Sequence, residues 1–520
     1  MKLVKHDATP HAALPYQYQM IHALNYASNI SRRTATAMLG GAAFLPQTAF
    51  AQGAATESAD VIIIGGGLSA LQAGLTLQEQ GAKVLVLEAT QRTGGRVYTA
   101  RDAPLQPEYG ASQIGRSYAR LIELCRRFDI ALVPEDRTVL PMSSLISGQW
   151  VRSENWESSN ANKMVGEERA LPPMAVGHKL MEKYNRLTDL QDWLDPNFAD
   201  LDISMRQLLT RHGHSAEALR LANFSTGGDD IDSASMLALM QEQVRQRLDL
   251  SFGPTDAKPA VMGFQENIKV EGELATINNI AGGTSTLTTA MAAALGDQLR
   301  TGQAVQRIDM DQQGAEVACA NGRRYRAKFV IAAVPFTALR KITITPDLLP
   351  LQREAVNKLG YGHTTRGFGV IDKPYWEDDG LEPSFFTDGP IRMFWALKPR
   401  SDENYHRFML VFTGQSAADI DKMSPADARA FSAAELARIR PSMVGRTQLN
   451  AWYGWGRDPM IGGCRHLFAP GQVTRFAADM ITPHAGLHFA GEHTRRIDFG
   501  MESALESGER AAFEIIERMS

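Results

Sequence analysis

The chain has 520 residues and a formal net charge of −4, with acidic and basic residues well mixed along it. A chain of this length exceeds what one hydrophobic core organises, so two domains are expected. Because no basic stripe or acidic tail stands out, nucleic acid is an improbable partner, and the expected ligand is a small molecule. Three cysteines lie far apart without C-x-x-C spacing, which argues against a disulfide framework and a metal cluster.

The first 52 residues resemble an export leader. Arg32 and Arg33 precede a run of small and apolar residues, and Ala49-Phe50-Ala51 resembles a cleavage site. A twin-arginine signal exports folded proteins, so the pattern predicts a periplasmic protein. The alternative is a retained, cytoplasmic arm in which the two arginines are surface charges. No later apolar run is long enough to span a membrane, so no membrane span is expected.

A βαβ unit opens the part after the leader. Residues 61–64 are a continuous β-branched run typical of a buried parallel strand, residues 68–80 have helical periodicity, and 83–88 indicate the next strand. The glycines between strand and helix predict dinucleotide binding, with the pyrophosphate at the helix N-terminus. An acid at the end of the second strand suits the ribose hydroxyls. The cofactor-binding candidates here are Gly65, Gly67, Leu68, Ser69, Ala70, Glu88 and Ala89.

A second glycine pair, Gly94-Gly95, follows and leads into Arg96. A nicotinamide dinucleotide needs no such pair, whereas the extended flavin dinucleotide benefits from a second close backbone approach and a cation. Arg96 is the predicted phosphate partner. The spacing therefore favours FAD.

The remaining elements alternate between helical and β-rich regions. A helix-rich stretch covers about 118–248, and short β-rich runs follow at 305–310, 316–320 and 329–333. Beyond a mixed region, the pattern predicts a helix at 425–439, a strand at 486–490 and a final helix near Met501, whose N-terminal dipole would stabilise the reduced flavin. The predicted FAD-binding domain comprises 58–115, 275–345 and 440–520, and the substrate domain comprises 116–274 and 346–439.

These motifs, together with the closing Gly491-Glu492 loop and the Gly500-Met501 helix start, resemble the flavin amine oxidase family. The family includes monoamine, polyamine and L-amino-acid oxidases, and the resemblance covers nearly all of the chain after Ser58. It implies an α/β, two-domain FAD-binding fold of the glutathione-reductase and amine-oxidase type, with a Rossmann-like FAD domain and an inserted α+β substrate domain. It also implies that Val305 meets the adenine and that Ala111-Ser112-Gln113 runs along the flavin.

The residues expected to face the substrate depart from the family pattern. Arg366 falls where the family holds a lysine near the flavin, and Arg465 and Gly500 fall where it builds an aromatic cage. An arginine in the cage would repel a protonated amine and attract an anion, so a carboxylated or phenolic substrate is one interpretation. The other is that Arg465 pairs with a local acid such as Asp458 or Glu492 and never meets substrate. Arg366 and Arg465 are the catalytic candidates, and Arg366 alternatively is a structural cation.

Cys464 falls on the cysteine that monoamine oxidases join to the flavin 8α-methyl group. The resemblance therefore implies covalent FAD, although a free cysteine is also a common buried residue. His466, His493, Trp452, Tyr453 and Trp455 are further candidates for the site, each explained equally well by structural hydrogen bonding or core packing.

The sequence thus predicts an FAD-dependent oxidoreductase that takes two electrons from a small amine and returns them to oxygen. One alternative keeps the fold but oxidises a carboxylated or phenolic non-amine. Another is a flavin-binding protein without turnover. The oligomeric state is open, and a homodimer is one assembly that the sequence allows.

Overall fold

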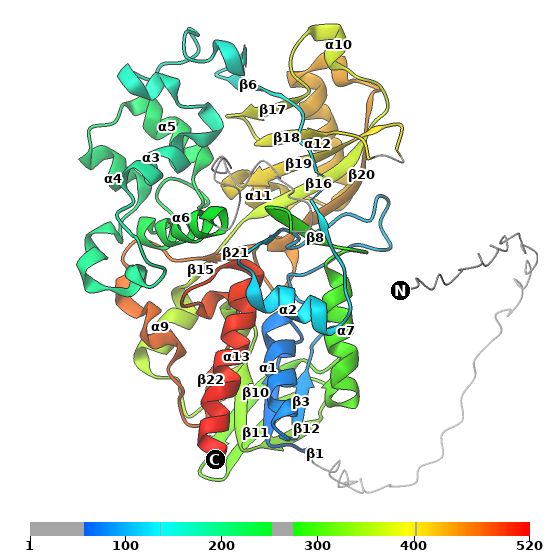
Figure 1. Ribbon diagram of the computed structural model, residues 1–520, viewed down its shortest axis with the longest axis vertical. Helices are drawn as coiled ribbons and strands as arrows, with labels where there is room; N and C mark the ends of the chain where they lie inside the picture. The colour runs from blue at the N-terminus through cyan, green and yellow to red at the C-terminus, as the bar shows by residue number, and fades with distance from the viewer. Residues whose placement is uncertain (1–56, 136, 252–273, 401–402) are drawn as a thin grey trace, which may run out of the picture. The chain divides into compact units, whose positions relative to one another are not determined.

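The computed structural model describes residues 57–135, 137–251, 274–400 and 403–520, all within one compact unit. The leader predicted at residues 1–52 lies outside the described residues. In Figure 1 the helices α13, α1 and α7 stand side by side in the lower half, and a large sheet that includes β16 to β20 fills the upper right.

A five-stranded parallel sheet forms the centre of the lower half, with strand order β22-β13-β2-β3-β9. Its strands come from widely separated parts of the chain: β2 (Val61–Ile64), β3 (Val84–Leu87), β9 (Leu299–Arg300), β13 (Phe329–Ala332) and β22 (Leu487–Phe489). The predicted α/β class with a parallel sheet is confirmed. The parallel sheet brings together strands from all three predicted FAD-binding segments, but the segment boundaries stay a prediction.

Strand β2 is buried along its whole length because both faces of the sheet are covered. Val61 and Ile63 join the core formed with the helices α1 (Leu68–Glu79), α7 (Ser285–Leu295) and α13 (Gly500–Met519). Ile62 and Ile64 point the other way and join a second core. On that side lies a sheet of order β1-β12-β11-β10-β14: β1 (Glu57–Ser58), β10 (Val305–Asp311), β11 (Gly314–Cys319), β12 (Arg324–Ala327) and β14 (Thr343–Thr345).

A seven-stranded sheet of order β20-β16-β19-β18-β17-β6-β7 forms the second large layer. Its strands are β6 (Met142–Ile146), β7 (Gln149–Arg152), β16 (Thr364–Ile371), β17 (Ser384–Thr387), β18 (Met393–Leu397), β19 (His406–Thr413) and β20 (Thr447–Gly454). The helices α11 (Gly414–Ile420) and α12 (Pro425–Ile439) contact it. Strand β20 lies inside the predicted segment 440–520 yet pairs with β16.

The helix-rich prediction for 118–248 needs one correction. The segment contains α2 (Ala119–Arg127), α3 (Val176–Tyr184), α4 (Met205–Arg211), α5 (Ala216–Ser225) and α6 (Met236–Ser251), but also β5 (Leu132–Pro134), β6 and β7. Strand β6 pairs with β17, more than 200 residues away, and this long-range pairing has no local sequence signal. The remaining elements are β4 (Ile114–Gly115), β8 (Ile277–Ile280), β15 (Gly360–Gly362), β21 (Arg465–Leu467), α8 (Phe336–Leu339), α9 (Pro350–Lys358) and α10 (Trp376–Asp379).

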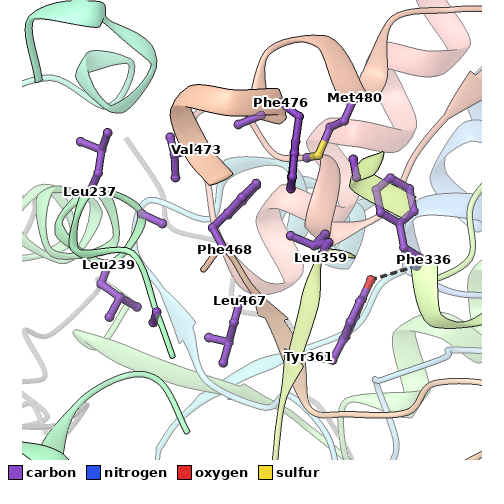
Figure 2. Packing of buried hydrophobic residues seen from close by; sticks show 14 of the residues in the cluster. Leu237, Leu239, Phe336, Leu359, Tyr361, Leu467, Phe468, Val473, Phe476 and Met480 are labelled. Atoms are coloured by element: carbon purple, nitrogen blue, oxygen red, sulfur yellow. Dashed lines mark hydrogen bonds between the residues drawn. The ribbon is translucent and has the colours of Figure 1, made fainter. Parts of the chain in front are cut away.

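Figure 2 shows the core around the short ladder β15–β21, where side chains from α6, α8 and residues 473–480 converge. The backbone N–H of Phe336 donates a 3.0 Å hydrogen bond to the Tyr361 hydroxyl, which ties α8 to β15. The Phe336 ring in turn contacts His493 edge to face, with ring centroids 4.3 Å apart. This core therefore supports the loop that carries Gly491 and His493.

Candidate active site

A cavity of about 1290 Å³ extends from the glycine-rich loops of the parallel sheet to the seven-stranded sheet. Among the predicted cofactor residues it is lined by Gly65, Gly67, Leu68, Ser69, Glu88, Ala89, Gly94, Gly95, Arg96, Ala111, Ser112, Gln113, Val305, Cys464, Gly491, Glu492, Gly500 and Met501. Both catalytic candidates, Arg366 and Arg465, also line it. The structure thus collects in one cavity residues that the sequence scatters over more than 400 positions.

Ala70 is the exception among the predicted cofactor residues. It is fully buried in the core between the parallel sheet and its helices and does not line the cavity. In the third small position of the motif, a methyl group packs the helix against the strand while the residues before it face the ligand. The structure thus places Ala70 in the core, and its contact with the cofactor stays a prediction.

The first glycines bring the backbone to the cavity wall. Gly65 has a φ of +106°, which favours glycine, and a Cβ on it would lie 2.9 Å from the Ala333 carbonyl oxygen. Helix α1 begins directly afterwards, and its N-cap residue Gly67 offers no side-chain cap. A Cβ on Gly67 would meet only the Gly95 Cα, at 3.9 Å. Free N–H groups at a helix start beside open space suit a phosphate group.

Glu88 follows strand β3 and faces this loop. Its Oε2 accepts a 2.6 Å hydrogen bond from the Gly66 N–H, and its Oε1 accepts hydrogen bonds from the backbone N–H and the hydroxyl of Thr90. A carboxylate can accept about four hydrogen bonds. Glu88 therefore holds the loop in shape and keeps room for one hydroxyl donor, as a ribose requires.

A buried ion-pair chain lies beside the second glycine pair. Arg96 Nη1 is 3.0 Å from Glu492 Oε2 and donates to the Cys464 carbonyl at 3.3 Å, and Glu492 Oε1 lies 2.9 Å from His466 Nδ1. Burial alone would raise the pKa of Glu492, but His466 and Arg96 together lower it. Burial lowers the pKa of His466, and Glu492 offsets only part of that effect. The phosphate contact of Arg96 remains a prediction, because its observed partners are Glu492 and Cys464.

The buried imidazole of His493 indicates what kind of group the cavity binds. Only 1% of it is exposed, it lines the cavity, and neither ring nitrogen has a hydrogen-bond partner among the residues that the structure describes. Burial lowers its pKa well below the ordinary value, so the imidazole is neutral and has one donor and one acceptor nitrogen. A buried polar group without a partner is costly, which indicates a polar ligand here. Together with the glycine cradle and the N-terminus of α13, these residues fit FAD.

The N-terminus of α13 reaches the cavity through Gly500 and Met501. Gly500 has a φ of +64°, and a Cβ on it would meet only the Tyr118 hydroxyl, at 3.6 Å. The backbone conformation, more than a lack of space, explains why glycine stands here in place of an aromatic residue. Val305 lies where strand β10 begins, next to an irregularity in its pairing with β11.

Cys464 is half-buried on the cavity wall and forms no disulfide. Its backbone N–H donates to the Gly362 carbonyl at 2.9 Å, and its carbonyl accepts from Arg96. A Cβ on the preceding Gly463 would lie 2.6 Å from the Tyr361 Cβ, so this tight packing fixes the turn. By contrast, Cys125 and Cys319 are buried elsewhere, as expected for core residues.

Arg465 has a different partner from those expected. Its Nη1 lies 2.6 Å from Glu242 Oε2, and its Nη2 donates to the Gly227 carbonyl at 2.5 Å. The local acids considered from the sequence, Asp458 and Glu492, are not these partners. Glu242 lies on α6, 223 residues away, and itself lines the cavity.

Other wall residues carried no sequence signal. They are Glu135 and Arg137 after β5, Trp395 and Leu397 on β18, and Met409 on β19. Of the further candidates, Trp455 and His493 line the cavity whereas Trp452, Tyr453 and His466 do not. Within the described ranges, the side chains form no cluster suited to a metal ion, and no helix there has the length and apolarity to cross a membrane.

Known proteins resemble this chain in sequence over most of its length. The family model of flavin containing amine oxidoreductases matches residues 68–516. A flavin-containing amine oxidase of Danio rerio is 26% identical over 483 residues, covering 88% of this chain and 85% of the relative. The flavin-containing amine oxidase B of Homo sapiens is 24% identical over 486 residues, covering 89% and 87%.

Solved structures show the same fold. Wild-type putrescine oxidase bound to putrescine matches with a TM-score of 0.70 and 22% identity over 89% of this chain and 100% of that one. Cyclohexylamine oxidase from Brevibacterium oxydans IH-35A matches with a TM-score of 0.70 and 20% identity over 89% and 99%. The predicted two-domain FAD-binding fold is confirmed. The chain therefore belongs to the flavin-containing amine oxidoreductases and is an FAD-dependent oxidoreductase.

Proposed function

We propose that this enzyme oxidises a small organic amine and passes the electrons to oxygen. The observation that carries the proposal is the continuity of the cavity, which joins the FAD-binding loops to a wall that includes Trp395, Leu397 and Met409. One continuous cavity can thus hold the cofactor and a small, partly apolar substrate side by side. Membership of the family supports the amine as the reacting group.

Bound FAD supplies the two-electron oxidant. Around it, the chain provides preorganised groups: the N-terminus of α13 at Gly500 and Met501 favours negative charge, and His493 offers a neutral imidazole. Because a charged ammonium is costly to desolvate against the apolar side chains of this wall, we expect the amine to react in its neutral form.

Anaerobic reduction tests the proposal. We expect a panel of small primary and secondary amines to include members that bleach the flavin absorbance, and admission of air to restore it with formation of peroxide. If no amine bleaches the flavin while a phenolic or carboxylated non-amine does, the alternative substrate class is correct. If no compound of either kind bleaches it, the chain binds flavin without turnover. A reduced flavin that persists in air would exclude oxygen as the acceptor.

We also propose that FAD is attached through Cys464. The fixed backbone and the position of the side chain on the cavity wall support this proposal. Attachment joins the Cys464 sulfur to the 8α-methyl carbon with loss of one proton from each and of two electrons, for which oxygen is the proposed acceptor. The free, half-buried state of the thiol is compatible with the reaction.

For location, we propose export to the periplasm through the leader that includes Arg32 and Arg33. Cell fractionation of the native chain and of a variant in which both arginines are lysines tests this. Retention of both forms in the cytoplasm would show that the leader is not functional.

A further inference from the structure

The wall of the cavity that Arg366 lines also contains two neutralised ion pairs. Arg137 forms a forked contact with Glu135, with distances of 2.6 Å from Nε to Oε1 and 2.5 Å from Nη2 to Oε2. Arg465 is held by Glu242 as described above. Each of these arginines therefore meets a carboxylate of the protein, and neither pair leaves a net charge.

Arg366 differs from them. In the described ranges 57–135, 137–251, 274–400 and 403–520 its side chain forms no hydrogen bond or ion pair, although the residue is partly buried on the cavity wall. Burial lowers the pKa of Arg366, and among its neighbours Cys464 raises this pKa whereas Arg137 lowers it further. A guanidinium stays charged even so. Of these three arginines on the cavity wall, Arg366 is the one without a carboxylate partner among the described residues.

The strand register shows what surrounds this charge. Arg366 on β16 lies opposite Val411 on β19, and two residues further along Phe368 lies opposite Met409, which itself lies opposite Trp395 on β18. Directly opposed residues share a face of a sheet, so the guanidinium and these apolar side chains lie on the same face. Arg366, Met409 and Trp395 all line the cavity. An unpaired cation on an apolar wall is costly without a counter-charge.

We propose that Arg366 binds a carboxylate of the substrate, and that the enzyme therefore acts on amines that carry a carboxylate on an apolar body. The inference rests on the proposed amine oxidation and names its substrate class. The planar guanidinium binds a carboxylate through two parallel hydrogen bonds, which gives orientation as well as affinity. A diamine brings a second positive charge, which the Arg366 guanidinium repels, so we expect a diamine to bind more weakly. Arg366 is thus a specificity-determining residue. Binding of an anionic substrate group, which the sequence analysis considers for Arg465, is here assigned to Arg366.

Binding of non-reacting probes to the FAD-loaded enzyme tests the inference without turnover. Benzoate and benzamide have the same ring and differ in charge, and their binding is followed by the change in flavin absorbance. We expect wild type to bind benzoate at least about tenfold more tightly than benzamide. Arg366→Met should abolish this difference, and Arg366→Lys should restore part of it. Arg307→Met, which removes an exposed arginine outside the cavity, should leave both affinities unchanged.

Two outcomes would overturn the inference. Equal affinity of wild type for benzoate and benzamide would show that Arg366 does not bind a carboxylate. Loss of FAD from Arg366→Met in proportion to the loss of benzoate binding would assign Arg366 to a cofactor phosphate. FAD content is therefore measured for each variant before titration.

Two matched pairs of reducing substrates test whether Arg366 also affects turnover. Benzylamine and 4-(aminomethyl)benzoate share the reacting group, and so do phenethylamine and phenylalanine. We expect at least one carboxylated partner to reduce the flavin about tenfold more efficiently under anaerobic conditions, with the advantage lost in Arg366→Met. If both uncharged partners react at least as well as the carboxylated ones, the inference fails while amine oxidation stands. If no amine of any kind reduces the flavin, the proposed function fails, and the benzoate titration still decides the role of Arg366.

Discussion

Glu242 on α6 and Arg465 on β21 form a 2.6 Å ion pair on the cavity wall, across 223 residues of sequence. The pair is mostly shielded from water, with 17% of the Glu242 side chain and 33% of the Arg465 side chain exposed. It neutralises the arginine that the sequence placed nearest to the substrate. Of the two arginines predicted at the substrate, Arg366 is the one that has no carboxylate partner among the described residues.

Glu242→Gln should therefore change both stability and ligand preference. Loss of the carboxylate leaves Arg465 with a neutral partner, and we expect a cost of about 1–2 kcal/mol in the free energy of unfolding. The extra positive charge on the wall should tighten benzoate binding. Thermal melting and flavin absorbance titration measure the two effects. Glu217→Gln, in a partly buried pair with Arg220 outside the cavity, is the control; an equal gain in benzoate affinity there would contradict the explanation.

Cys464→Ser tests covalent attachment. We expect acid-precipitated wild-type protein to stay yellow and the variant to release its FAD into the supernatant. Cys125→Ala is the matched control, because Cys125 is buried on α2 away from the cavity and should not affect attachment. Free FAD in the wild-type supernatant would show that the cofactor is held without a covalent bond.

Two glycines of α13 should respond differently to alanine. At Gly500 there is space for a Cβ, but the φ of +64° should make Gly500→Ala cost about 1 kcal/mol. At Gly508 a Cβ would lie 2.2 Å from the Ser69 carbonyl oxygen, so Gly508→Ala should force α1 and α13 apart and cost more, about 3 kcal/mol. Denaturant unfolding compares the two. Equal costs would contradict this distinction.

Stability should fall as the pH drops below about 6.5, the ordinary pKa of histidine. Burial lowers the pKa of His493 in the folded chain, so in this range the unfolded chain binds the proton and the folded chain does not. The stability present above pH 6.5 is then lost by up to about 1.4 kcal/mol per pH unit for this group. Unfolding measured from pH 8 to 5.5 should show a smaller slope for His493→Gln than for wild type. Replacement of the exposed His212 by glutamine should leave the slope unchanged.

The cofactor end of the cavity was predictable because its signals are local. The strand, the glycines from Gly65 to Gly67, the helix and Glu88 follow one another within about thirty residues, and each element has its own periodicity or turn chemistry. The predicted helix at 425–439 has the observed bounds for the same reason. Even here Ala70 was assigned to the ligand, since a motif does not say which of its residues face inward.

The substrate end was not predictable in this way. Glu135, Glu242 and Trp395 lie on a loop, a helix and a strand without a motif, and they meet only when three distant parts of the chain pack together. The partner of Arg465 was sought among nearby acids, although charge pairing depends on distance in space. The strands β6 and β7 were missed because their partner β17 lies far along the chain.

The sequence by itself determined the cofactor, the parallel sheet and the family, because backbone geometry at glycines and the burial pattern of strands are set by neighbouring residues. Only the tertiary structure decided which charges on the cavity wall are neutralised. Glu242 neutralises the charge of Arg465. No carboxylate among the described residues pairs with Arg366, so its charge is available to a ligand. The physical reason is that electrostatic pairing in a buried cavity depends on contacts between segments that no local pattern records.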